Sequence, residues 1–195
     1  MREADKILYH LLNYERNAEL LERIPHVPYL DLAIVFSRQE EGGKSRRLIT
    51  GERGEESGWL EEMASVNTPR NCPVYFHTLD EVIREFEAEI GMPVPRRSSG
   101  FPMYLLTNIQ KFLGASAMLY PGLLNHLARG LNENFYILPS SIHECILIPE
   151  SAGCTREELK EMVRSVNDLQ VPEQEILAYE VYYYCLQEDC IYWRE

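Results

Sequence analysis

Residues 135–148 read FYILPSSIHECILI, two apolar runs on either side of a short polar segment. The runs Phe135–Leu138 and Glu144–Ile148 have the length and the aromatic and β-branched content of strands. The segment Pro139–His143 has the chemistry of a turn, because serine hydroxyls bond nearby backbone groups. We therefore predict two strands here with a polar connection between them.

Further strands and helices are predicted on both sides of this pair. Short apolar runs typical of strands occupy residues 29–36, 47–50, 74–76, 103–107 and 180–185. Helical spacing of apolar residues marks 7–24, 59–67, 82–90, 123–131 and 159–166. The pairs Thr78/Glu81 and Thr155/Glu158 have the spacing of a capping box at a helix start.

The mixture of strands and helices lacks strict βαβ alternation, which favours the α+β class. We predict one α+β domain over residues 1–195, with a mixed β-sheet and amphipathic helices packed mainly on one face. A length of 195 residues fits one domain. The segment 91–102 has three prolines and two glycines, so a boundary between two lobes there is the alternative.

Charge and hydropathy exclude several classes of protein. The chain has 31 acidic and 19 basic residues and a net charge of −12, which disfavours nucleic acid and anionic membranes as partners. Its apolar runs are far shorter than the ~18 residues of a membrane helix. We expect a cytoplasmic protein that binds neither nucleic acid nor membrane.

The five cysteines do not have the spacing of a zinc site or of a CxxC pair. We interpret them as reduced thiols, with a redox-sensing pair of Cys185 and Cys190 as the alternative. The five histidines are scattered without the spacing of metal ligands. We therefore predict no metal and no cofactor.

Residues Ser140, Ser141, His143 and Glu144 are the candidates for chemistry. A serine nucleophile needs a base within hydrogen-bond reach, and the base needs an orienting group. In an extended chain Ser141 and His143 share one face while Glu144 points to the other. Because this geometry leaves no proton relay, we favour a structural role, with ligand binding and covalent catalysis as alternatives.

Tyrosines crowd the C-terminal part of the chain. Tyr182, Tyr183 and Tyr184 are consecutive, and such clusters suit interfaces because tyrosine supplies a large contact area at low entropic cost. They form our candidate interface with a protein partner or a second copy. The alternative is an outer strand whose rings pack over neighbouring helices.

Several strings resemble an uncharacterised family of gut Firmicutes, chiefly Clostridia, which is known as a domain of unknown function. Residues 13–17 and 30–36 resemble the start of the family's sequence, and residues 106–108 resemble its middle. Residues 136–144, which contain the sequence PSSIHE, resemble its most distinctive motif. The resemblance covers about Asn13 to Tyr184. It implies no activity, cofactor or catalytic residue, and family members often have more sequence before the position of Met1. Asn108 joins Ser140–Glu144 as a candidate binding residue.

Two functions remain open from the residues. The favoured one is a non-catalytic cytosolic module that binds a ligand or a protein, including a second copy of itself. The alternative is a small hydrolase or ligand-binding enzyme that uses the Ser140–Glu144 segment. We lean against an enzyme, because the sequence lacks a complete catalytic constellation.

Overall fold

The computed structural model describes residues 3–40, 45–51, 56–94 and 100–193, which form two antiparallel sheets. The first sheet has the order β1-β3-β2, with β4 also paired to β3. Its strands are β1 (Ile7–Asn13), β2 (His26–Tyr29), β3 (Leu32–Gln39) and β4 (Arg46–Leu48). The second sheet has the order β10-β9-β7-β8-β6-β5. Its strands are β5 (Val74–Thr78), β6 (Tyr104–Asn108), β7 (Phe135–Leu138), β8 (Cys145–Pro149), β9 (Tyr182–Cys185) and β10 (Cys190–Tyr192).

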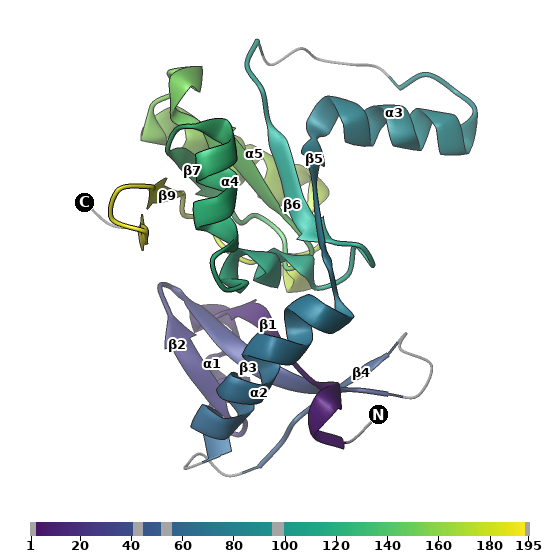
Figure 1. Cartoon of the computed structure of the whole chain (residues 1–195), viewed down its shortest axis with the longest axis vertical. Coiled ribbons are helices and arrows are strands. Elements are labelled where there is room, and N and C mark those ends of the chain that lie inside the picture. The colour runs from purple at the N-terminus through teal and green to yellow at the C-terminus, as the bar shows by residue number, and fades with distance from the viewer. Residues whose placement is uncertain (1–2, 41–44, 52–55, 95–99, 194–195) are drawn as a thin grey trace.

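Helices connect and cover these sheets, as Figure 1 shows. The α-helices are α1 (Ala18–Leu21), α2 (Glu56–Asn71), α3 (Leu79–Ile90), α4 (Leu123–Leu131) and α5 (Arg156–Gln170). The 3-10 turns are η1 (Glu3–Lys6), η2 (Glu15–Asn17), η3 (Gly114–Leu119), η4 (Glu150–Ala152) and η5 (Glu173–Glu175). None of the helices in the described ranges is long and apolar enough to cross a membrane.

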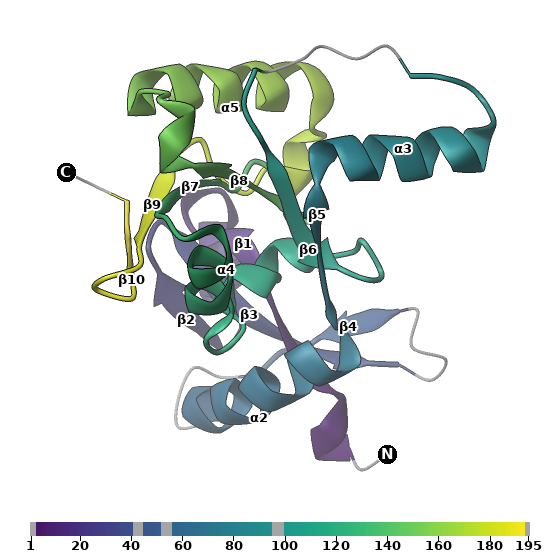
Figure 2. The same ribbon diagram turned by 45° about the horizontal axis from the view of Figure 1, so that its top comes forward.

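One hydrophobic core joins the two sheets. Ile34 and Phe36 of the first sheet belong to the same buried cluster as Phe135 and Leu147 of the second. Residues of α2, η3 and α4 complete this cluster. The opposite face of the second sheet is covered by α5, as Figure 2 shows. Leu159 and Val163 of α5 share a buried cluster with Ile148 of β8.

The α+β class is confirmed, but the arrangement of the sheet differs from the prediction. The strands form two sheets instead of one, and every pairing between the named strands is antiparallel. Helices lie on both faces of the second sheet, not mainly on one. The local pattern of a strand does not encode its partner, because pairing is chosen by contacts between distant segments.

The prediction of a helix from residue 7 is wrong, because residues 7–13 form β1. Ile7 and Leu11 face the core between the sheets, while Leu12 packs on the other side with Leu21 of α1. A strand that is buried on both faces has a nearly continuous apolar sequence, which periodicity cannot separate from a helix.

The segment considered as a lobe boundary, residues 91–102, lies between two strands that pair with each other. The segment follows α3 and leads into β6, and β6 pairs with β5 in one sheet. Part of it, residues 95–99, lies outside the described residues. Both capping boxes are confirmed, at Thr78 for α3 and at Thr155 for α5.

Candidate functional site

The Ser141–Glu144 segment opens onto a polar hollow of about 300 Å³. The hollow is lined by Lys111, Ser141, His143, Glu144, Gln170, Val171, Pro172 and Glu175. The expectation that His143 and Glu144 point apart is therefore wrong, since both line this hollow. The reason is local: residues 142 and 143 form a bend and β8 begins at Cys145, so the alternation of a strand does not apply.

Both nitrogens of the His143 ring have neighbours inside the protein. The backbone N–H of Leu113 donates to Nδ1 at 3.1 Å. Nε2 lies 3.6 Å from the Glu175 Oε1 atom. These neighbours favour the tautomer with hydrogen on Nε2, because Nδ1 accepts a hydrogen bond. No lone pair of the neutral ring is then left to take a proton from a nucleophile.

Ser141 is buried and forms part of the backbone scaffold. Its Oγ accepts the His143 backbone N–H at 3.0 Å, and its residue is 4% exposed. Within the described ranges no hydrogen bond joins this hydroxyl to the His143 ring. Ser140 is half-buried, and its carbonyl accepts the Leu177 N–H at 3.0 Å. The structure thus brings the predicted residues together without the serine–histidine pair that acyl transfer requires.

Burial raises the pKa of the Glu144 carboxyl above its ordinary value. The nearby His143 and a hydrogen bond with Ser141 act against this shift, while repulsion from Glu175 adds to it. A carboxylate in such surroundings costs free energy when it is ionised.

Asn108 lies behind the hollow and does not line it. Its Nδ2 donates to the Phe112 carbonyl at 2.9 Å, and its Oδ1 accepts from Gln110 N at 3.0 Å. The side chain is 1% exposed, so it organises the loop before η3 instead of meeting a ligand. That loop carries Leu113, the residue that contacts His143. Asn108 is therefore a structural residue of the hollow, and its place among the binding candidates is corrected.

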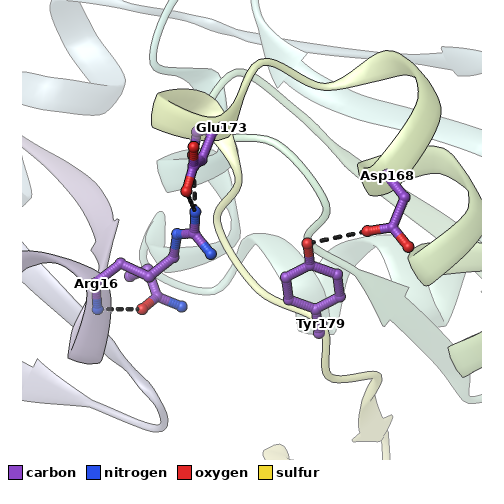
Figure 3. A network of polar contacts seen from close by, with 5 residues as sticks. Arg16, Asp168, Glu173 and Tyr179 are labelled. Atoms are coloured by element: carbon purple, nitrogen blue, oxygen red, sulfur yellow. Dashed lines mark hydrogen bonds and ion pairs between the residues drawn. The ribbon is translucent and has the colours of Figure 1, made fainter.

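The segment after α5 places Glu175 at the hollow and ties it to the first sheet. Arg16 Nη2 donates to Glu173 Oε1 at 2.8 Å, as Figure 3 shows. In the same view the Tyr179 hydroxyl donates to Asp168 Oδ1 at 3.2 Å. Asn13 Nδ2 also donates to the Leu177 carbonyl at 2.9 Å. The hollow therefore depends on contacts between segments far apart in the chain.

The tyrosines proposed as an interface lie mostly inside the protein. Tyr182 and Tyr184 are 0% and 2% exposed. Tyr183 is half-buried, and its hydroxyl donates to Glu150 Oε1 at 2.9 Å. Their strand β9 is paired on both sides, with β7 and with β10. The interface prediction is corrected, because neither a free edge nor the rings of Tyr182 and Tyr184 are available to a partner.

A second and larger space, the intersheet pocket, lies between the two sheets and has a volume of about 410 Å³. It is lined by Tyr9, Tyr29, Ile34, Glu61, Ser65, Met118, Leu119, Tyr120, Pro121, Gly122, Leu124, Asn125, Tyr184, Asp189, Cys190 and Ile191. The lining comes from β1, β2, β3, α2, η3, α4 and the β9–β10 hairpin. No local motif could have revealed this site, because its residues are spread from position 9 to position 191.

The four tyrosines of the pocket differ in how their hydroxyls are used. Tyr120 donates to the Cys72 carbonyl at 2.6 Å, and Tyr184 donates to Asp189 Oδ1 at 2.5 Å. The Tyr9 residue is 3% exposed, and its buried hydroxyl has no hydrogen-bond partner among the described residues. Burial raises the pKa of Tyr29 to about 12 and that of Tyr9 further, so these phenols stay neutral.

The structure treats the possible metal ligands and the two cysteines of the alternative redox pair differently. The described part of the chain holds no group of three or more His, Cys, Asp or Glu side chains arranged for a metal ion. Cys185 and Cys190 are opposite each other in the β9–β10 pair, and both are free thiols.

A family model described as a family of unknown function, DUF5688, matches residues 2–185. The chain belongs to the DUF5688 family. This agrees with the resemblance to a family of unknown function that the sequence strings indicated. No curated protein and no solved structure matches the chain.

The DUF5688 match contains every residue that lines the polar hollow. It also contains the lining of the intersheet pocket, except for Asp189, Cys190 and Ile191 of the C-terminal hairpin. Both spaces thus belong largely to the part of the chain that the DUF5688 model describes.

Proposed function

We propose that this DUF5688 protein is a non-catalytic cytoplasmic module that binds a small organic molecule in the intersheet pocket. The observation that carries the proposal is the intersheet pocket itself, whose walls come from both sheets and from α2, η3 and α4 and include four tyrosines. The volume of about 410 Å³ is within the usual size of ligand pockets.

The non-catalytic part of the proposal rests on the polar hollow. A hydrolase would need a base near Ser141, yet the His143 Nδ1 accepts the Leu113 N–H and Nε2 faces Glu175. The side chains that the alternative would use are therefore engaged in holding the bend. These contacts favour a binding module over a serine hydrolase.

The cytoplasmic location is supported by the thiols and the charge. All five cysteines are free in the fold, as is usual in a reducing compartment. A net charge of −12 favours solubility and disfavours contact with anionic surfaces.

The test is to block the pocket and follow the binding of small aromatic probes. Ser65 lines the pocket from α2, so Ser65→Trp should fill part of the space. Val66 is the next residue, is 64% exposed and does not line the pocket, so Val66→Trp is the matched control. Amide-resolved NMR is recorded with phenethylamine, phenethyl alcohol and phenylacetate.

At least one probe is expected to shift the amide signals of pocket residues such as Tyr29 and Leu119 in the wild type and in Val66→Trp. Ser65→Trp should abolish these shifts. If none of the probes shifts these signals, or if Ser65→Trp binds as the wild type does, the pocket is not a binding site of this kind.

A further inference from the structure

We propose that the ligand of the intersheet pocket is an organic ammonium ion, a protonated amine joined to an apolar or aromatic group. This inference rests on the proposed function and adds the chemical class of the ligand.

The ionisable charges of the lining have one sign. Glu61 on α2 and Asp189 in the β9–β10 turn are both exposed at the rim. The described residues that line the pocket include no lysine, arginine or histidine. The chain as a whole carries a net charge of −12. A cleft lined by acidic groups in an acidic protein attracts cations and repels carboxylates and phosphates.

The aromatic lining suits the same ligand. Tyr9, Tyr29, Tyr120 and Tyr184 reach the pocket from four different segments. The rings of Tyr9 and Tyr120 have centroids 6.4 Å apart and are inclined by 55°, so they are tilted and not stacked. The negative face of a tyrosine ring attracts an ammonium or a guanidinium group.

The protein's own cations do not occupy these rings. In the described part of the chain, the cation–ring contacts are Arg46 with Phe112 at 5.8 Å and Lys111 with Tyr75 at 4.9 Å. Neither ring belongs to the pocket. The tyrosines of the pocket are therefore not neutralised from within by the described residues.

The exposed acceptors of the lining match the hydrogen-bonding character of an amine. An ammonium group has donors and no acceptor, and the carboxylate oxygens of Glu61 and Asp189 can accept from it. The hydroxyls of Tyr120 and Tyr184 already donate to oxygens of the protein. Their oxygens also keep lone pairs for an incoming donor. A carboxylate ligand would instead meet the Glu61 and Asp189 charges.

Three probes of similar shape and different charge test this class of ligand. Phenethylamine is cationic, phenethyl alcohol is neutral and phenylacetate is anionic. NMR titrations at low salt are expected to give an affinity for the amine about tenfold higher than for the alcohol, because cation–π and carboxylate contacts add. Phenylacetate should bind most weakly, and added sodium chloride should weaken the binding of the amine.

Substitutions at the rim distinguish attraction of the amine by the carboxylates of the pocket from attraction by the overall negative charge of the protein. Asp189→Asn and Glu61→Gln should each lower the affinity for the amine by about two- to fivefold and leave the affinity for the alcohol unchanged. Asn suits position 189, whose φ is 51°, because it tolerates the left-handed region. Glu62→Gln removes the charge of a neighbouring α2 residue that does not line the pocket. It should change the affinity for neither probe.

The outcomes distinguish this inference from the function on which it rests. If the alcohol binds as tightly as the amine and Ser65→Trp abolishes both, the pocket is a binding site but its ligand is not a cation. If Glu62→Gln weakens the amine as much as Asp189→Asn does, the attraction is a general effect of charge and the inference fails. If no probe binds at the pocket, both the inference and the proposed function fail.

Discussion

The polar hollow and the intersheet pocket differ in how their polar groups are used. At the hollow, the His143 ring accepts the Leu113 N–H and the Ser141 oxygen accepts the His143 N–H. At the pocket, the Tyr9 hydroxyl is buried and has no partner in the described ranges. The hollow has the residue types of a catalytic site, and its histidine and serine form hydrogen bonds within the fold. Hydrogen-bond satisfaction, more than residue type, separates the two.

This difference predicts opposite responses to substitution. Removing groups that the fold hydrogen-bonds or packs closely should cost stability, because their partners are left without a bond or the backbone must shift. Removing the Tyr9 hydroxyl, which has no partner among the described residues, or the charge of Glu144, whose burial opposes ionisation, should cost nothing or stabilise the protein. Four sets of substitutions test this contrast.

Gly114→Ala should be the most destabilising change. A Cβ atom at this position would lie 2.0 Å from Thr107 Oγ1 and 2.7 Å from the His143 carbonyl oxygen. Because the backbone of η3 must shift to relieve these contacts, we expect a loss of about 3 kcal/mol or more in urea denaturation. Gly130→Ala in α4 meets open space and should instead gain about 0.5–1 kcal/mol. Equal effects of the two substitutions would contradict the close packing behind the hollow.

Asn108→Ala should cost about 2–3 kcal/mol, because it leaves the backbone groups of Gln110 and Phe112 without a buried partner. The matched change at the pocket is Asn125→Ala, which removes an exposed hydrogen bond from Arg129 Nε and a hydrogen bond with the Tyr184 side chain. It should cost no more than about 1 kcal/mol. Chemical denaturation measures both, and a loss at Asn125 as large as that at Asn108 would remove the contrast.

Tyr9→Phe and Tyr120→Phe should change the free energy of unfolding in opposite directions. The first removes a buried hydroxyl that has no partner in the described structure, so we expect no loss or a gain of about 1 kcal/mol. The second removes the hydrogen bond to the Cys72 carbonyl and should cost about 1 kcal/mol. Both are measured by thermal and urea unfolding without ligand. A clear loss in Tyr9→Phe would mean that its hydroxyl is satisfied in solution, and would weaken the case for the pocket.

Glu144→Gln should have the weakest effect and a dependence on pH. The raised pKa of Glu144 means that the folded protein resists ionisation of this carboxyl. Stability is therefore lost as the pH rises from the ordinary pKa of 4.5, which applies to the unfolded chain, to the raised pKa of the folded protein. The variant should be more stable than the wild type at about pH 7 and equal to it at about pH 4. Glu161→Gln on the exposed side of α5 controls for the loss of one negative charge, and an equal gain there would refute the role of burial.

Local features of the fold could be predicted because they depend on neighbouring residues. The capping boxes at Thr78 and Thr155 need a side chain and a backbone three positions away, and both formed as expected. The strand Phe135–Leu138 also agrees with its prediction. The β10 strand was missed, since residues 190–192 are too few to give a pattern.

The candidate site was harder to predict, because its geometry depends on distant contacts. His143 and Glu144 meet at one hollow since the chain bends there, and the bend is held by Leu113 and by the backbone of Glu175. Tyr182 and Tyr184 were expected at a surface and are buried by packing between the sheets. Alternation along a strand could not reveal either outcome.

The order of residues by itself determined the α+β class, the capped helix starts and the acidic character of this protein. Each of these follows from composition or from interactions within a few positions. Tertiary structure alone decided that the strands form two sheets, that the serine–histidine segment bends at a polar hollow and that tyrosines from distant segments share a pocket. The physical reason is that burial and hydrogen-bond partners are set by residues that meet only after the chain has folded.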